Sequence, residues 1–128
     1  MNTKFNQKGQ ALIILLFFVI VSIMVTSSAV ILAFVNSQSA AKVQVGANAF
    51  SIAESGAENA AVRLLRDPSY SGETVSLNGG TAVSTVSTAG STKTIVSTGT
   101  SGNFIRKIQV IADYTNNIFT ISSWKEIP

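Results

Sequence analysis

Cysteine and histidine are both absent from this chain of 128 residues. Without them the protein has no thiolate or imidazole ligands for a metal ion, no cysteine nucleophile and no Ser-His-Asp arrangement. Disulfide bonds are excluded as well, so a domain outside the cytoplasm must be stabilised by its own packing or by its neighbours. We expect a protein that is not an enzyme and that binds no cofactor or metal ion.

Charged residues are missing from a long stretch near the start of the chain. None occurs between Lys8 and Lys42, and residues 11–35 are almost wholly apolar. Because about 20 apolar residues suffice to cross the hydrocarbon core of a bilayer, this segment predicts a membrane-spanning helix. Its serine and threonine hydroxyls can bond to carbonyls one turn earlier, so they carry little cost in lipid.

The charges that flank this segment predict its orientation. Lys4 and Lys8 precede it with no acidic residue nearby, whereas Lys42 is the only charged residue between the segment and Glu54. Positive charge is retained on the cytoplasmic side of a membrane. We therefore expect a single span with a short N-terminus inside, and everything after about residue 36 outside the cytoplasm.

Beyond residue 42, apolar residues recur at helical spacings of three and four. They are Val43, Ala47, Phe50, Ala53, Ala57, Ala61 and Leu64; the residues opposite are Gln44, Asn48, Ser51, Ser55, Asn59, Arg63 and Arg66. This pattern predicts an amphipathic helix with a narrow, alanine-rich stripe, which Gly46 and Gly56 weaken by about 1 kcal/mol each. Since no proline precedes Pro68, we predict a single helix over residues 10–66, ended by Asp67-Pro68.

From residue 69 the composition changes to serine, threonine and glycine with scattered valine and isoleucine, which favours strands separated by turns. The expected strands are residues 73–77, 81–87, 92–98, 104–114 and 118–124. In the fourth strand, one face carries Phe104, Ile108, Val110, Ala112 and Tyr114. The pattern predicts an antiparallel meander of four or five strands.

The predicted sheet has too few large apolar residues to fill a two-layer sandwich, so one of its faces needs a cover. The candidate cover is the helix stripe formed by Phe50, Ala53, Ala57, Ala61 and Leu64. The expected fold class is therefore α+β: a long N-terminal helix, with a membrane-spanning half and an amphipathic outer half, packed on a small C-terminal antiparallel β-sheet.

The beginning of the chain resembles the type IV pilin and pseudopilin family. The likeness rests on Lys8-Gly9, on "QALI" at residues 10–13 with the apolar run behind it, and on the alanine-rich residues 49–60, which are similar to the outer helix of minor-pilin-like members. The likeness covers about the first 66 residues. The region after them resembles the family only in that it is predicted to form a β-sheet.

The resemblance implies that a membrane-bound prepilin peptidase recognises Lys8, Gly9 and Gln10 and cuts after Gly9. It also implies that the retained helices bundle in a filament core through Ala11, Leu12, Ile13, Ile14, Leu15, Leu16 and Val19. The implied domains are a leader at residues 1–9, the helix at 10–66 and the β domain at 67–128. The implied partners are other pilin-like subunits in a homo- or hetero-oligomeric filament, the peptidase, a pilus assembly platform, and membrane lipid before assembly. The implied location is the cytoplasmic membrane and then an extracellular or periplasmic filament.

Ile14 is a departure from that family. It stands five residues into the predicted mature chain, where the family usually has a glutamate thought to pair with the amino terminus of a neighbouring subunit. A carboxylate in a bilayer is costly, so its absence removes that cost together with a charge-based register. We expect either a tip or minor subunit, or a filament aligned by packing alone.

Other interpretations stay open. A single-span anchored surface protein that displays a small β domain for adhesion accounts for the apolar run equally well. A cleavable signal peptide ending near residues 39–41 is disfavoured, because the apolar core of such peptides spans about 7–15 residues. Glu54 and Glu58 lie one helical turn apart, and we expect a solvated or subunit-facing edge there rather than a catalytic carboxylate pair.

A basic and aromatic surface for nucleic acid is a further possibility in the sheet region. Its residues are Lys93, Arg106, Lys107, Lys125, Tyr114 and Trp124. Arg106 and Lys107 point to opposite faces if they share a strand, which argues against one continuous patch. Scattered solubilising charges, with Trp124 as a packing residue, are the preferred interpretation, so we do not expect nucleic acid as a partner.

Overall fold

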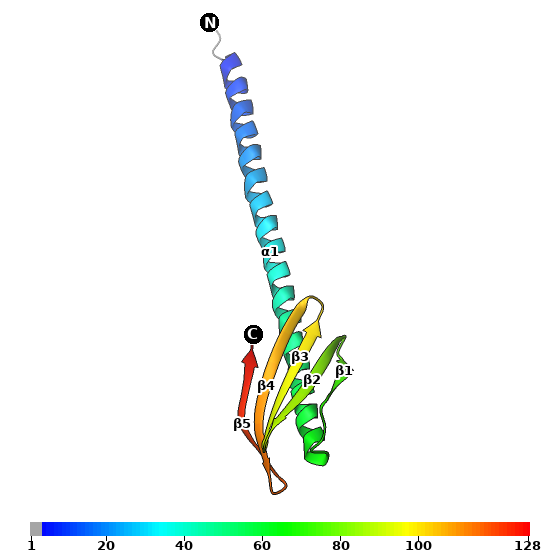
Figure 1. Ribbon diagram of the computed structural model, residues 1–128. Coiled ribbons are helices and arrows are strands. Elements are labelled where there is room, and N and C mark those ends of the chain that lie inside the picture. Colours follow the sequence, from blue (N-terminus) through cyan, green and yellow to red (C-terminus); the bar gives the residue numbers. More distant parts are fainter. Residues whose placement is uncertain (1–3) are drawn as a thin grey trace. The chain divides into compact units, whose positions relative to one another are not determined.

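The computed structural model describes residues 4–128, with side chains from Gly9 onward. One helix, α1 (Lys4–Arg66), precedes five strands (Figure 1). The strands are β1 (Gly72–Leu77), β2 (Gly80–Ala89), β3 (Thr92–Ser101), β4 (Phe104–Thr115) and β5 (Ile118–Ile127). The predicted α+β class is confirmed. The chain divides between Ala41 and Lys42 into two compact units, which are described separately.

Helix α1 begins earlier than predicted. The expected start was Gln10, whereas the helix already includes Lys4. No proline lies in this region, and a single glycine such as Gly9 lowers helix stability without ending the helix. The first three residues of the predicted leader lie outside the described part of the chain, as does the side chain of Lys8.

Helix α1 ends where Asp67-Pro68 predicts. The Asp67 backbone N–H donates to the Arg63 carbonyl oxygen at 2.8 Å, which closes the last turn. Asp67 Oδ1 then accepts hydrogen bonds from Ser69 Oγ at 2.5 Å and from the Ser69 backbone N–H at 2.9 Å. Both bonds favour the carboxylate and hold the pKa of Asp67 below its usual value.

The sheet is an antiparallel meander in the order β1-β2-β3-β4-β5, as predicted. Residues with left-handed backbone conformations form two of the tight turns: Asn78 and Gly79 between β1 and β2, and Asn116 and Asn117 between β4 and β5. Successive residues of this kind suit the two-residue hairpin turns that match the twist of the strands. A register shift between Ile111 and Ala112 places a bulge in the pairing of β4 with β5.

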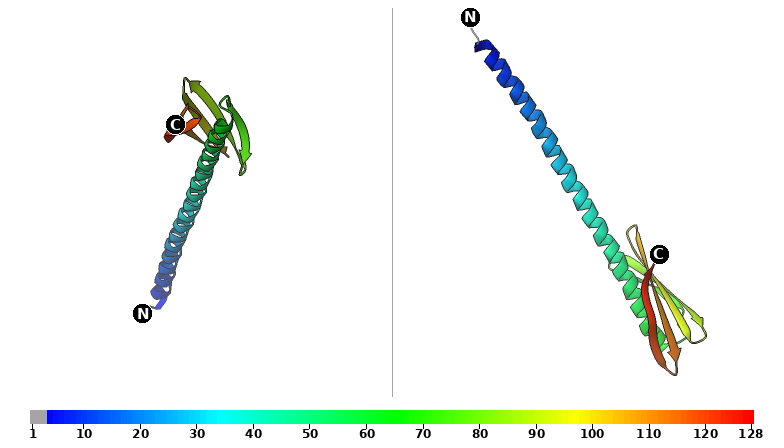
Figure 2. Two further views of the ribbon diagram at one scale, coloured as in Figure 1. Left: turned by 90° about the horizontal axis from the view of Figure 1, so that it is seen from below. Right: turned by 90° about the vertical axis from the view of Figure 1, so that its left-hand side faces the viewer.

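Residues 42–66 of α1 cover one face of this sheet (Figures 1 and 2). The hydrophobic core between them is formed by Ala53, Ala57, Ala60, Ala61, Leu64, Ile95, Ile108 and Val110. In β4 the buried residues Ile108, Val110 and Ala112 alternate with residues of the outer face, which confirms the predicted period of two. The helix side of this core consists mainly of alanine, so the helix and the sheet can approach closely.

The buried face of the helix differs from the predicted stripe at its N-terminal end and in its width. Val43 is 73% exposed and Ala47 is exposed, so neither covers the sheet. The buried face instead includes Gly46, Ala49, Ile52, Gly56 and Ala60. The prediction from hydrophobic periodicity relies on the larger apolar residues. Where the helix lies close to the sheet, however, the buried positions are mostly those with small side chains.

Candidate assembly helix and helix-sheet contact

The apolar half of α1 presents its large side chains to the surroundings. From Leu12 to Val35, the exposed fractions of the large hydrophobic side chains range from 41% to 69%. The helix is long and apolar enough to cross a membrane, and no residue of its most apolar stretch is buried within the described part of the protein. An apolar surface of this extent needs a cover of lipid or of other helices.

Three of the four hydroxyl residues in this segment form hydrogen bonds inside the helix. Ser22 Oγ donates to the Phe18 carbonyl oxygen, Thr26 Oγ1 to that of Ser22, and Ser28 Oγ to that of Met24, each at 2.8 Å. These are the bonds to the preceding turn that the sequence predicts. They leave no hydroxyl of these residues without a partner in an apolar environment.

The predicted assembly residues lie on the exposed surface of this half. Leu12, Leu15, Leu16 and Val19 line one shallow apolar hollow along the helix. Ala11, Ile13 and Ile14 are exposed as well. Spacings of three and four residues place the four lining side chains on one side of the helix, as required for packing against a neighbouring helix.

The predicted processing residues Gly9 and Gln10 are exposed and lie within α1. A side chain added at Gly9 would meet no other atom within 4 Å. Among the side chains that the structure describes, from Gly9 onward, none therefore covers the bond between Gly9 and Gln10.

The contact between α1 and the sheet depends on two glycines that approach the opposite element. A Cβ atom added at Gly56 would lie 2.8 Å from Ala82 Cβ, 3.2 Å from Ser84 Oγ and closer still to Ser97 Oγ. One added at Gly99 of β3 would lie 2.9 Å from Ala53 Cα and closer to the Ala49 carbonyl oxygen. Both glycines are therefore contact residues, a role that the helix propensity of Gly56 did not indicate.

The other predicted packing residues of α1 take part in the same contact. Ala53, Ala57, Ala61 and Leu64 are buried in the core, and Phe50 is partly buried against it. The Ser84 hydroxyl donates to the Gly56 carbonyl oxygen at 3.0 Å, which adds a polar bond at the closest point.

Polar residues of α1 bond to β1 and to the end of β3, which the sequence did not predict. Asn59 Nδ2 donates to Glu73 Oε1 at 2.6 Å, and Arg63 Nε forms an ion pair with the same oxygen at 3.0 Å. Asn48 Nδ2 donates to Ser101 Oγ at 2.9 Å. The helical pattern of the sequence places Asn48, Asn59 and Arg63 on the face opposite the stripe. No pattern in the sequence links them to their partners, because the pairing depends on how the sheet folds back.

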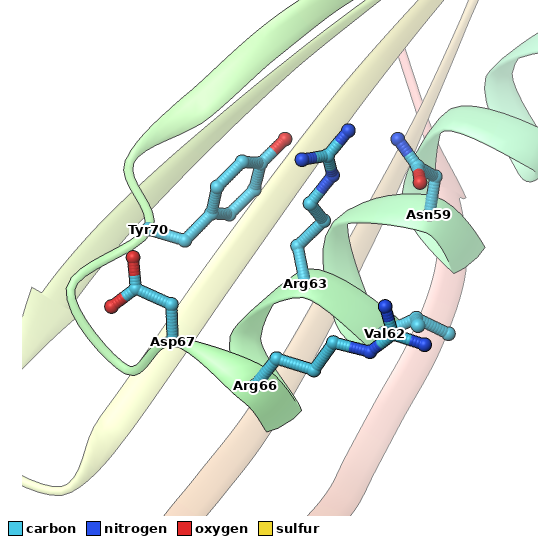
Figure 3. Close-up of a pocket in the computed structure, with 6 residues that line it drawn as sticks. All are labelled: Asn59, Val62, Arg63, Arg66, Asp67 and Tyr70. Carbon is cyan, nitrogen blue, oxygen red and sulfur yellow. The ribbon is translucent and has the colours of Figure 1, made fainter.

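A cavity of about 530 Å³ lies where α1 ends, lined by Asn59, Val62, Arg63, Arg66, Asp67 and Tyr70 (Figure 3). The hydroxyl oxygen of Tyr70 is buried there and has no hydrogen-bond partner within the described part of the chain. Burial and the negative charge of Glu73 raise the pKa of Tyr70, and the positive charge of Arg63 opposes this shift.

This environment predicts an alkaline sensitivity. The neutral form of Tyr70 is favoured in the folded state, so its contribution to stability is complete below the ordinary tyrosine pKa of about 10 and is lost as the pH rises through the higher value of the folded protein. In Tyr70→Phe we expect the free energy of unfolding to fall less steeply between about pH 9 and pH 11 than in the original chain. Trp124 fluorescence during chemical unfolding in detergent measures this difference. Equal slopes in the two proteins would contradict the assignment.

Comparison with protein families found no matching family model, and comparisons with curated proteins and with solved structures found no match. The fold and the exposed helix define a class: an α+β protein with one helix long and apolar enough to span a membrane, joined to a small antiparallel β domain. This architecture is consistent with a pilin-like or a membrane-anchored protein.

Proposed function

We propose that the chain is a pilin-like structural subunit. A peptidase at the membrane cuts it after Gly9, and the apolar part of α1 then holds the subunit in a type IV pilus or pseudopilus filament. The observation that carries this proposal is the exposed apolar surface of α1 from Leu12 to Val35. Lipid covers this surface before assembly, and the corresponding helices of other subunits cover it afterwards.

The continuity of α1 supports the proposal. One uninterrupted helix supplies both the apolar segment and the cover of the sheet. A plain membrane anchor needs no such continuity, since a flexible linker would serve equally well between the span and the displayed domain. In a filament, by contrast, the same helix serves both for packing between subunits and for covering the sheet.

The absence of a glutamate at position 14 is part of the proposal. Ile14 is exposed on α1 and offers no charge to a neighbouring amino terminus. The register between subunits then has to come from apolar packing along the helix and from contacts between the β domains. This arrangement suits a minor subunit or a filament held by packing alone.

The first test is the intact mass and N-terminal sequence of the protein recovered from its native membrane. We expect a chain that begins at Gln10, because the peptidase cuts after Gly9. A chain that still begins at Met1 would favour an anchored surface protein. A chain that begins near Lys42 would mean a secreted domain without an assembly helix, and both results would overturn the proposal.

A further inference from the structure

One side of α1 carries two glutamates without partners. Glu54 and Glu58 are one turn apart, and neither forms an ion pair among residues 9–128, whose side chains the structure describes. Asn59 and Arg63 occupy the side of the helix that bonds to β1. With 3.6 residues per turn, Glu54 lies across the buried stripe from Asn59, on the side toward β5, and is partly exposed, whereas Glu58 lies farther out and is exposed. Two like charges at this spacing repel each other, so an isolated subunit gains nothing from the pair.

Exposed apolar side chains of β5 lie on the same side of the sheet as the glutamates. On β5, Trp124 pairs with Val110 and Ile121 pairs with Ala112. Because Val110 and Ala112 are buried under the helix, Trp124 and Ile121 lie on the same face of the sheet, at its open edge. They are 38% and 46% exposed. We call the surface formed by Glu54, Glu58, Ile121 and Trp124 the acidic flank.

Two lysines occupy the opposite face of the sheet. Lys107 pairs with Ile127 and Lys125 pairs with Gln109, so both lysines belong to the outer face of the β4-β5 ladder and are diagonal neighbours. Neither has an acidic side chain as partner in the described part of the chain, although Lys107 Nζ donates to the Pro128 carbonyl oxygen at 3.2 Å. Ile105, on the same face, is 60% exposed. We call the surface formed by Ile105, Lys107 and Lys125 the basic face.

The two surfaces match in charge and in spacing. Residues four apart on a helix have Cβ atoms about 5–6 Å apart, and diagonal neighbours in an antiparallel pair are separated by up to about 7–8 Å. Each carboxylate of the acidic flank can therefore meet one ammonium group of the basic face. Exposed apolar residues stand beside both charged pairs, as in protein interfaces where polar groups surround an apolar centre.

The fold prevents these surfaces from meeting within one molecule. The acidic flank lies on the helix side of the sheet, whereas the basic face points away from the helix. A contact between them must join two copies through different patches. Such a heterologous contact leaves a free patch on each copy, so it repeats and produces an open helical array unless it closes into a ring.

We propose that the acidic flank of one copy docks on the basic face of a second copy. The contact pairs Glu54 and Glu58 with Lys107 and Lys125, beside an apolar centre formed by Trp124, Ile121 and Ile105. This inference rests on the proposed filament function and names the domain contact that sets the register in the absence of a glutamate at position 14.

A charge exchange in the full-length chain tests this contact. The acidic variant carries Glu54→Lys and Glu58→Lys, the basic variant carries Lys107→Glu and Lys125→Glu, and the exchange variant carries all of them. Lys42→Glu with Arg66→Glu is the matched control for the basic variant. It reverses the same number of basic residues, and neither Lys42 nor Arg66 forms an ion pair among the described side chains. Circular dichroism of the detergent-solubilised proteins verifies that each variant is folded.

The measured quantity is the fraction of protein in sedimenting assemblies from native membranes. We expect each one-sided reversal to lower this fraction by at least about tenfold, since close like charges across an interface strongly oppose binding. The exchange variant restores it to within about threefold, and the control leaves it unchanged. One-sided reversals that assemble like the original chain, or an exchange variant that assembles no better than they do, would overturn the docking proposal.

A second readout separates this proposal from the filament function. The chain has no cysteine, so a single Leu16→Cys substitution reports proximity between apolar helices through an interchain disulfide without background. Disulfide dimers of normal yield, together with reversals that have no effect, would leave the filament function standing and refute the docking contact. If the Leu16→Cys chain gives no disulfide dimers and the original chain gives no sedimenting assemblies, both proposals fail.

Discussion

Replacing Gly56 by alanine is expected to destabilise the β domain by about 1–3 kcal/mol, the usual cost of overpacking a tight core. On helix propensity alone the same substitution would stabilise α1 by about 1 kcal/mol. We expect a loss of stability instead of a gain because the new Cβ would lie 2.8 Å from Ala82 Cβ and closer to the hydroxyl of Ser97. Chemical unfolding of the full chain in detergent, monitored by Trp124 fluorescence, gives the free energy directly.

Gly46→Ala is the matched control for this substitution. Gly46 is also a buried glycine of α1, but its added Cβ would lie 3.6 Å from Phe104 Cδ1, which is an ordinary contact. We expect Gly46→Ala to stabilise the helix by up to about 1 kcal/mol. If both substitutions changed stability in the same direction, the close approach at Gly56 would not determine the packing.

Introducing a charge at Leu16 is expected to abolish assembly. An unpaired charge buried between packed apolar side chains costs about 3–5 kcal/mol, and each 1.4 kcal/mol is about a tenfold change in an equilibrium constant. Leu16→Asp places this charge in the apolar hollow shared with Leu12, Leu15 and Val19. We therefore expect the assembled fraction to fall by roughly a hundredfold.

The control for Leu16→Asp is the same charge on the other unit of the chain. Val43 is 73% exposed and does not cover the sheet, so Val43→Asp should leave the assembled fraction unchanged. Membrane fractionation must accompany both variants, because a charge in the apolar segment can also impair insertion. Unchanged assembly in an inserted Leu16→Asp protein would refute packing through this part of the helix.

Local patterns in the sequence predict most of the fold. The threonine-rich strands and the turn at Asn78–Gly80 mark the hairpins, and proline at position 68 marks the end of α1. The alternation in β4 identifies which residues face the helix. These features depend on residues near one another in the chain, and that is why periodicity and turn chemistry are sufficient to locate them.

The helix-sheet contact could be predicted only in part. The alanines at 53, 57 and 61 belong to the predicted stripe, but Gly56 and Gly99 are recognised as contact residues only once the helix lies on the sheet. The partners of Glu73 were missed for the same reason. Asn59 and Arg63 are polar, so hydropathy assigns them to solvent, although they bond to a strand that follows them in the chain.

The order of the strands has a consequence for how quickly the domain forms. Every strand pairs only with its immediate neighbours in the sequence, through hairpins with short turns. Contacts between residues that are near in sequence need little loop closure, so domains rich in them fold fast. A meander can therefore grow hairpin by hairpin, so that each strand finds its partner already in place. A fast-folding domain of this kind spends little time with unpaired strand edges, which lowers its tendency to aggregate while it folds.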